Sequence, residues 1–374
     1  MKILILTITA GEGHNATAAS IQSALQERGH ECTVVDTWLH ISRSLYNIVS
    51  KGYLLSTADF KRTYAWTYAR LERRKVNSYN KSLTRSTYKM IKKKIVSYIE
   101  EYDPDVIVYT HVFAGIFLDV IAEKMPLRAR TVGIVTDFVM HPFWEEALRT
   151  DRVVIPNELL IPAAARKGLL PAQIAPIGIP VRKQFSTMRE KSEARRMLGL
   201  DEGKPTLLLM GGSMGYGSLS ENLLALDGVQ TDLQLICVCG NNKKAKEEID
   251  ATTFTHRVLN FGYTDKIDLL MDAADCIVTK PGGLTTSEAL AKRLPIIIAN
   301  PIPGHEDRNA EFLLNSGAAA MATKTSRLSD VVYQLFYHPA RLEQMKNNID
   351  LIRKPNAAAD LIALIESLAK TDKE

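Results

Sequence analysis

The sequence predicts an α/β protein of two domains, each built on a parallel sheet flanked by helices. Its 374 residues suit two domains, since one domain typically takes about 100–200 residues. In both halves, short apolar runs alternate with helical patterns, which is typical of parallel strands joined by crossover helices. A polar, charged stretch at 180–193 separates the two series. We therefore expect domains at 1–185 and 186–355, with the last helix, at about 356–374, packing back on the first domain.

The individual elements follow from the apolar runs and from residues that start or end helices. In the first half we expect strands at 3–9, 32–36, 105–110, 131–136, 152–156 and 174–177. The first helix covers 16–28, with Asn15 at its start and Gly29 at its end. In the second half we expect strands at 206–210, 233–239, 257–261, 276–279 and 295–299, and a last helix at 357–368. The carboxyl ends of the two sheets are expected to face each other across a cleft, where ligands bind.

The composition excludes several classes of protein. With 46% hydrophobic and 24% charged residues, the chain is neither disordered nor collagenous. Its apolar runs are far shorter than the ~20 residues of a membrane span, and Met1-Lys2 leads straight into a strand without a signal peptide, so we expect a cytoplasmic protein. The four cysteines lie inside apolar runs, and the only Asp-x-Asp, at 103–105, lies in a predicted turn. The residues therefore predict no metal site.

The segment 41–100 is strongly basic and rich in aromatic residues. It contains 14 Lys/Arg and 3 Asp/Glu, a balance of +11 in a chain of net charge +5, and nine of the chain's 26 aromatic residues. Such a segment fits an anionic membrane surface or a nucleic acid. A solvated helical face with inward-packed aromatic residues explains the same pattern.

A first glycine loop, 11–16, follows the first strand and opens a helix. It has the form G-x-G-x-x-A, and Asp36 ends the second strand 20 residues beyond Ala16. That spacing is typical of dinucleotide-binding folds, so an NAD-dependent dehydrogenase is one hypothesis. However, His14 brings a polar group to a helix N-terminus, where the dipole disfavours its cation, so a neutral His14 can accept a proton. A hydrogen-bonded loop histidine is the structural alternative.

Three further loops suit a nucleotide sugar. Gly211-Gly212-Ser213-Met214-Gly215 follows a strand and is suited to a diphosphate. In 279–290, a glycine turn leads into a helix that carries Glu288, which is placed to accept hydrogen bonds from a ribose diol. In the loop 301–310, Glu306 and Asn309 are spaced i, i+3 and share a face, as recognition of sugar hydroxyls requires. Tight turns and helix caps are the structural alternatives.

These motifs together resemble one family of enzymes. The loop ending in Gly13-His14, the loop at 211–213, and the segments 282–289 and 303–309 are similar to inverting GT-B glycosyltransferases. That family contains bacterial diacylglycerol glucosyltransferases, plant monogalactosyldiacylglycerol synthases and the peptidoglycan lipid II synthase. The segments 135–144 and 174–185 resemble the diacylglycerol branch. The resemblance covers nearly the whole chain in the expected order, and it implies the GT-B fold, two Rossmann-like domains facing across a cleft.

The resemblance also implies roles for particular residues. Gly212, Ser213 and Gly215 are expected near the diphosphate of UDP, Gly262 and Tyr263 near uracil, and Glu288 at the ribose. His305, Glu306 and Asn309 are expected at the hexose, and His14 is the first choice for the general base, followed by Asp137 or His141. Gly13, Asn15, Gly283, Thr285 and Thr286 complete the predicted substrate-binding set. No metal or other cofactor is expected.

The implied reaction transfers a hexose from a UDP-sugar to the hydroxyl of diacylglycerol with inversion. UDP-glucose is the favoured donor. UDP-galactose stays the other candidate, because His305 stands where many relatives have Gln. The implied location is peripheral, on the inner face of the cell membrane, with the segment 41–100 on the anionic lipid surface and no nucleic-acid partner. A UDP-GlcNAc transferase acting on a polyprenyl-linked acceptor, a UDP-sugar epimerase and an NAD-dependent dehydrogenase are the alternatives.

Overall fold

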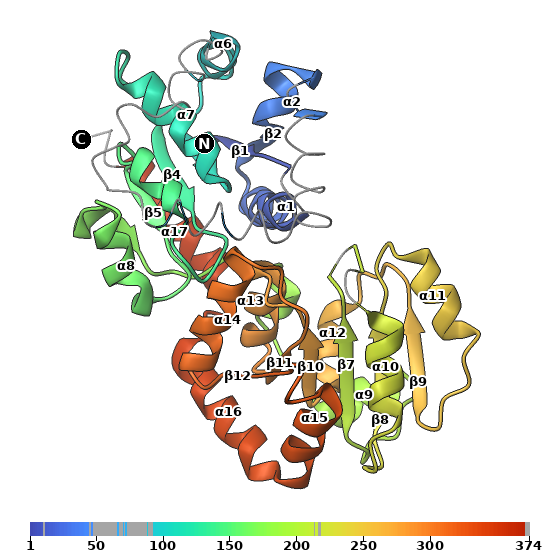
Figure 1. Cartoon of the computed structure of the whole chain (residues 1–374). Helices are drawn as coiled ribbons and strands as arrows, with labels where there is room; N and C mark the ends of the chain where they lie inside the picture. Colours follow the sequence, from blue (N-terminus) through green and yellow to red (C-terminus); the bar gives the residue numbers. More distant parts are fainter. Residues whose placement is uncertain are drawn as a thin grey trace. The chain divides into compact units, whose positions relative to one another are not determined.

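A computed structural model of the chain describes residues 1–9, 12–44, 46, 47, 66, 70, 72, 88, 93–212, 214, 215 and 218–370. It divides into two compact units (Figure 1). Unit 1 comprises residues 1–183, 303–305 and 356–374, and unit 2 comprises residues 184–302 and 306–355. Most of the basic segment 41–100, together with Ser213, lies outside the described residues.

Unit 1 contains a six-stranded parallel sheet in the order β2-β1-β3-β4-β5-β6. Its strands are β1 (Lys2–Thr7), β2 (Glu31–Asp36), β3 (Val106–Tyr109), β4 (Arg130–Ile134), β5 (Arg152–Val154) and β6 (Ile174–Ala175). Its α-helices are α1 (Glu12–Glu27), α2 (Thr37–Ile41), α6 (Lys93–Tyr102), α7 (Val112–Ala122), α8 (Ile161–Arg166) and α17 (Ala357–Lys370). All six predicted strands of this half are confirmed, with ends that differ by up to two residues.

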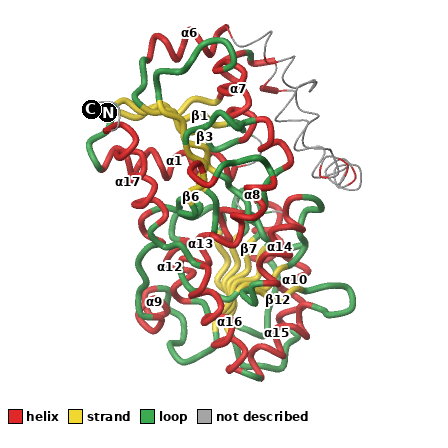
Figure 2. The backbone as a smooth tube through the Cα atoms, turned by 90° about the vertical axis from the view of Figure 1, so that its left-hand side faces the viewer, coloured by secondary structure: helices red, strands yellow, loops and turns green. Residues whose placement is uncertain are grey.

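One hydrophobic core cluster of unit 1 forms where α1 and α17 cover one face of the sheet. Ala18, Ile21 and Leu25 recur at helical spacing along α1 and are buried against the strands. Ile365 of α17 joins the same cluster, together with Ile5 of β1. The tube in Figure 2 shows α17 beside this sheet. Helix α17 therefore contributes to the core of the first unit.

The start of α1 differs from the prediction. The helix begins at Glu12 rather than at residue 16, so Asn15 lies in its first turn and does not cap it. The Asn15 side chain instead accepts a hydrogen bond from Thr7 Oγ1 at 3.0 Å and donates one to Thr9 Oγ1 at 3.0 Å. These contacts place Asn15 at the carboxyl end of β1.

Unit 2 repeats the architecture, with the parallel order β12-β11-β10-β7-β8-β9. Its strands are β7 (Thr206–Met210), β8 (Gln234–Val238), β9 (Arg257–Phe261), β10 (Cys276–Thr279), β11 (Ile296–Ile298) and β12 (Ala319–Met321). Its α-helices are α9 (Lys191–Met197), α10 (Leu219–Asp227), α11 (Lys243–Asp250), α12 (Ile267–Ala273), α13 (Gly283–Ala291), α14 (His305–Asn315), α15 (Leu328–Tyr337) and α16 (Pro339–Ile352). The prediction missed β12, a three-residue edge strand whose Ala-Ala-Met sequence lacks β-branched residues.

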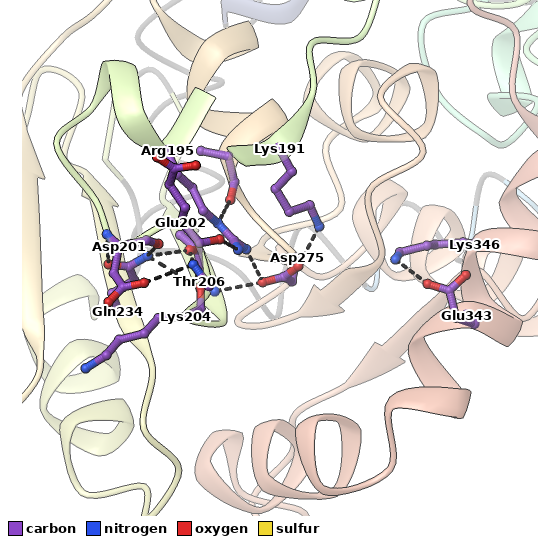
Figure 3. Close-up of polar contacts among 12 residues, drawn as sticks. Lys191, Arg195, Asp201, Glu202, Lys204, Thr206, Gln234, Asp275, Glu343 and Lys346 are labelled. Atoms are coloured by element: carbon purple, nitrogen blue, oxygen red, sulfur yellow. Dashed lines mark hydrogen bonds and ion pairs between the residues drawn. The ribbon is translucent and has the colours of Figure 1, made fainter. Parts of the chain in front are cut away.

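A polar network fastens α9 to the amino ends of the unit 2 strands (Figure 3). The Asp275 carboxylate accepts hydrogen bonds from the Thr206 amide at 2.8 Å and from Arg195 at 2.6 Å. Gln234 Nε2 donates to the Asp201 carbonyl at 2.7 Å. This network lies at the opposite end of the sheet from the glycine loops, which follow the carboxyl ends of β7 and β10.

The cysteines and the hydropathy of the helices agree with the sequence analysis. Cys32, Cys237, Cys239 and Cys276 are buried free thiols, and burial raises the pKa of Cys32 to about 12. Among the helices that the structure describes, none has the length and apolar character needed to cross a membrane. Asp103 and Asp105 lie in the turn before β3, where Asp105 Oδ2 accepts from the Lys2 amide at 2.7 Å.

Candidate active site

In unit 1, β1 and β3 mark the point where the order of the strands reverses. β1 lies between β2 and β3, so the connections that leave β1 and β3 run in opposite directions. Open parallel sheets bind ligands beyond the carboxyl ends of the strands at this point. The first turn of α1, after β1, and the segments that follow β3 and β4 bring His14, Thr110 and Thr136 together there.

The contacts of His14 fix which of its ring nitrogens carries a proton. Nδ1 lies 2.7 Å from the carbonyl oxygen of Thr110 and 3.1 Å from Oγ1 of Thr136. A carbonyl oxygen only accepts, so Nδ1 holds the proton and Nε2 keeps a lone pair. Burial lowers the pKa of His14 below 6.5, although Asp137 and the Thr110 carbonyl oppose that shift. His14 is therefore neutral at pH 7, as a general base must be.

Asp137, His111 and His141 belong to the same neighbourhood. The ring of His111 packs against that of His14, with centroids 4.5 Å apart. The Asp137 charge opposes the lowering of the pKa of both His14 and His141. Burial dominates at His141 and lowers its pKa to about 3. The structure thus brings together the three predicted catalytic residues and adds His111.

Asp36, which suggested a dinucleotide, is engaged by its own chain. Its Oδ2 accepts from the amide and the hydroxyl of Thr9 at 2.9 and 2.7 Å, and its Oδ1 accepts from the Leu39 amide at 2.9 Å. In dinucleotide-binding folds, the acidic residue at this position binds a ribose hydroxyl. Here Asp36 caps α2 and binds Thr9, which argues against the hypothesis of an NAD-dependent dehydrogenase.

In unit 2, the corresponding reversal point lies between β7 and β10. Gly212, after β7, adopts φ +73°, and a Cβ built there lies 3.4 Å from Cε of Lys280, after β10. Gly215 has φ +61°, and a Cβ at Gly215 meets the Cys239 carbonyl oxygen at 2.1 Å. The positive φ favours glycine at both positions, and at Gly215 the carbonyl oxygen also leaves no room for a Cβ. The structure therefore places Lys280 beside the predicted diphosphate loop.

The helix α13 and the end of β9 hold the other predicted nucleotide residues. Gly283 is the first residue of α13, so its backbone amide is among those that the start of the helix leaves for an anion. Thr286 and Glu288, further along α13, are 0% and 7% exposed, whereas Thr285 is partly exposed. Gly262 and Tyr263 follow β9, and Tyr263 is 74% exposed.

Two of the predicted hexose residues make hydrogen bonds to neighbouring segments of unit 2. Glu306 is 1% exposed, and its oxygens accept from Lys280 Nζ at 2.6 Å and from the Ile302 amide at 2.7 Å. Asn309 is 0% exposed and donates to the Pro281 carbonyl at 2.9 Å. His305 is partly exposed at the start of α14. Contact with a hexose stays a prediction for all three, and Glu306 has both oxygens engaged within the chain.

Two known sequence families cover most of the chain. The family described as monogalactosyldiacylglycerol (MGDG) synthase matches residues 14–181, and the glycosyltransferase family 28 C-terminal domain matches residues 206–364. Monogalactosyldiacylglycerol synthase 1 of Arabidopsis thaliana is 31% identical, and the match covers 99% of this chain and 71% of that protein. This chain belongs to the monogalactosyldiacylglycerol synthase family.

A bacterial relative and two solved structures extend the comparison. Processive diacylglycerol beta-glucosyltransferase of Bacillus pumilus is 29% identical, over 96% of this chain and 93% of that protein. The crystal structure of Acinetobacter baumannii MurG superposes with a TM-score of 0.67 at 15% identity, covering 98% of this chain and 100% of that chain. Anabaena HepE in complex with UDP superposes with a TM-score of 0.57 at 13% identity, covering 98% and 100%. These likenesses confirm the GT-B fold.

Membership of the monogalactosyldiacylglycerol synthase family makes this protein a glycosyltransferase. The dehydrogenase and the epimerase are thereby set aside, and the engagement of Asp36 gives a physical reason for the first. The sequence analysis missed Lys280 as a site residue. Its position directly before Pro281-Gly282-Gly283, at the end of a strand, is the signal that could have identified it.

Proposed function

We propose that this enzyme transfers a hexose from a UDP-sugar to the hydroxyl of diacylglycerol with inversion at the anomeric carbon. UDP-glucose is the favoured donor, and UDP-galactose is the alternative. The observation that carries the proposal is the neutral His14 at the reversal point of unit 1, with a lone pair on Nε2, in a chain of the monogalactosyldiacylglycerol synthase family. Its relatives in Bacillus pumilus and Arabidopsis thaliana are named for acting on or making diacylglycerol lipids.

The reaction is a single in-line displacement. The acceptor hydroxyl gives its proton to His14 Nε2, and its oxygen forms a bond to the anomeric carbon. The bond from that carbon to the UDP oxygen breaks, and UDP leaves with the electron pair. Because the oxygen attacks opposite to the leaving group, the configuration inverts. Asp137 stabilises the imidazolium that forms, since its charge favours protonated His14.

The donor is held by unit 2 in this proposal. The diphosphate lies on the loop with Gly212, Ser213 and Gly215, beside the start of α13 and the Lys280 cation. Glu288 accepts hydrogen bonds from the ribose diol, and Gly262 and Tyr263 lie at the uracil. Backbone amides at a helix start and a fixed cation stabilise the charge that develops on the leaving diphosphate.

Lipid products test the proposal directly. The enzyme is incubated with vesicles that contain both diacylglycerol and a polyprenyl-linked acceptor, and with UDP-glucose, UDP-galactose or UDP-GlcNAc. The extracted lipids are identified by mass spectrometry, and the anomeric linkage is determined by ¹H NMR. We expect hexosyl-diacylglycerol with a β-linkage from an α-linked donor, and more of it with UDP-glucose than with UDP-galactose. Transfer of GlcNAc to a polyprenyl-linked acceptor, with none to diacylglycerol, would contradict the assignment.

A substitution in α13 tests the donor site. Glu288→Ala is expected to weaken UDP binding by about 1.5–3 kcal/mol, the contribution of hydrogen bonds to a charged acceptor. Isothermal titration calorimetry with UDP measures the change. Glu311→Ala, at an exposed position of α14, is the matched control and should bind UDP like the wild type. Unchanged UDP affinity in Glu288→Ala removes Glu288 from the ribose.

The proposed donor site also predicts how activity responds to chelation. The start of α13 and Lys280 supply the positive charge that the leaving diphosphate needs. Hexose transfer should therefore proceed in excess EDTA at the same rate as without EDTA. Initial rates with and without EDTA measure this. A loss of activity that added Mg²⁺ restores would show that the mechanism requires a metal.

We propose further that residues 41–100 dock the enzyme on the inner face of the cell membrane, where diacylglycerol resides. Each Lys or Arg near an anionic surface contributes about 1 kcal/mol. Reversal of Arg73, Arg74 and Lys75 to Glu should therefore weaken binding to phosphatidylglycerol vesicles by at least ~100-fold. Co-sedimentation with vesicles measures the loss. Lys92-Lys93-Lys94 is the second dense cluster, in which Lys94 also donates to the Ile41 carbonyl at 2.8 Å.

The control for membrane docking reverses the same number of charges in unit 2. Lys243, Lys244 and Lys324 are exposed, and their reversal to Glu should leave sedimentation unchanged. Raised salt should weaken wild-type binding, because surface charges are screened beyond a Debye length. Equal, salt-insensitive binding of the wild type to phosphatidylcholine and phosphatidylglycerol would show that charge does not drive docking.

A further inference from the structure

Two neighbouring histidines of unit 1 carry their protons on opposite ring nitrogens. His14 Nδ1 faces the Thr110 carbonyl at 2.7 Å, so its proton is on Nδ1 and its lone pair is on Nε2. His111 is the N-cap of α7, and its Nδ1 accepts from the Phe113 amide at 3.1 Å. An amide N–H only donates, so this Nδ1 is unprotonated and neutral His111 carries its proton on Nε2.

The two rings pack against each other beyond the carboxyl end of β3. Their centroids are 4.5 Å apart and their planes are tilted by 57°. Thr110, whose carbonyl orients His14, is followed directly by His111 in the chain. Burial lowers the pKa of His111 well below 6.5, and the neighbouring His14 and His141 lower it further. At neutral pH the pair therefore offers one hydrogen-bond acceptor and one donor, without net charge.

We propose that His111 donates its Nε2–H to the oxygen of the acceptor hydroxyl that His14 deprotonates. A hydroxyl has one proton and two lone pairs. Its proton fits the lone pair of His14, one oxygen lone pair fits the proton of His111, and the second lone pair is left to attack the sugar. During transfer, the hydroxyl proton moves to His14, the oxygen–carbon bond forms, UDP leaves with the electron pair, and His111 keeps its proton.

This role rests on the proposed function and adds specificity to it. An alcohol satisfies both histidines at once, whereas an ammonium group has no lone pair for His111. The pair thereby selects a neutral hydroxyl and fixes the position of its oxygen. Orientation of this kind accelerates a displacement because the reacting atoms are already aligned.

Two substitutions separate donation to the substrate from capping of α7. His111→Asn places Oδ1 near the position of Nδ1 and so keeps the cap, but it loses the distal N–H. His111→Gln extends an amide N–H toward the position of Nε2 and gives up the cap. We expect His111→Asn to lose about 10- to 100-fold in kcat/KM for diacylglycerol at wild-type Tm, and His111→Gln to retain most of its activity with a lower Tm.

The opposite order of activities would show that His111 serves only as a cap. UDP affinity, measured by calorimetry, should be unchanged in both variants, because the donor is bound by unit 2. A second measurement needs no turnover: ¹⁵N NMR of histidine-labelled enzyme at pH 7 should show His14 protonated on Nδ1 and His111 on Nε2. Absence of transfer by the wild type overturns the proposed function, whereas a proton on Nδ1 of His111 overturns this role.

Discussion

Replacement of His14 by alanine is expected to lower turnover by roughly 10²–10⁴, the usual contribution of a general base. The acceptor hydroxyl then has no group to take its proton, although the donor site is intact. His14→Asn should be equally impaired, because its amide can still reach the Thr110 carbonyl but offers no basic nitrogen in place of Nε2. Initial rates with diacylglycerol vesicles measure kcat, and calorimetry with UDP should give wild-type affinity.

The pH profile supplies an independent signature of the same residue. The pKa of His14 is lowered by burial, so the base is neutral above that pKa and protonated below it. kcat/KM should therefore fall as the pH decreases, with a midpoint below 6.5. In His14→Asn, this fall of kcat/KM at low pH should be absent. His30→Ala removes only the contact of His30 with Glu366 at 3.0 Å and should retain both rate and profile. A loss below about threefold in His14→Ala would move the base to Asp137 or His141.

Replacement of Glu306 by alanine is expected to destabilise the protein by about 3–5 kcal/mol, the cost of breaking a buried ion pair. Glu306 is 1% exposed and accepts from both Lys280 and the Ile302 amide. Its removal leaves a partly buried cation and a backbone N–H without this acceptor. Urea unfolding followed by circular dichroism measures the change. Because Lys280 lies beside the diphosphate loop, UDP affinity should change as well.

Two further variants test whether the burial of Glu306 explains the loss of stability in Glu306→Ala. Glu306→Gln keeps an oxygen for the Ile302 amide and should lose less stability than Glu306→Ala. Asp307→Ala, one residue along α14, affects a more exposed carboxylate that pairs with Arg308 at 3.9 Å, and should change stability by less than about 1 kcal/mol. A loss in Glu306→Ala as small as that in Asp307→Ala would show that the Lys280–Glu306 pair does not hold the loop.

Both sheets could be predicted from the sequence because their central strands are buried on both faces. Such strands are continuous apolar runs, as in Thr206–Met210 and Cys276–Thr279, and the structure has both with the predicted ends. The edge strand β12 escaped prediction because Ala319–Met321 is short and only partly buried. The start of α1 was misplaced because Asn15 resembles a cap in sequence, whereas in three dimensions its partners are Thr7 and Thr9.

The sequence by itself determined the repeated α/β architecture, the loops at the carboxyl ends of the strands and the family, because these depend on local apolar patterns and on short motifs. The tertiary structure decided what each polar residue in those loops does. Glu306, Asn309 and Asp36 carry groups suited to a sugar or a ribose, yet in the fold they hold Lys280, Pro281 and Thr9. The tautomer of His14 likewise depends on a carbonyl 96 residues away. A hydrogen bond is satisfied by whichever partner the fold brings within reach, and sequence spacing alone does not specify that partner.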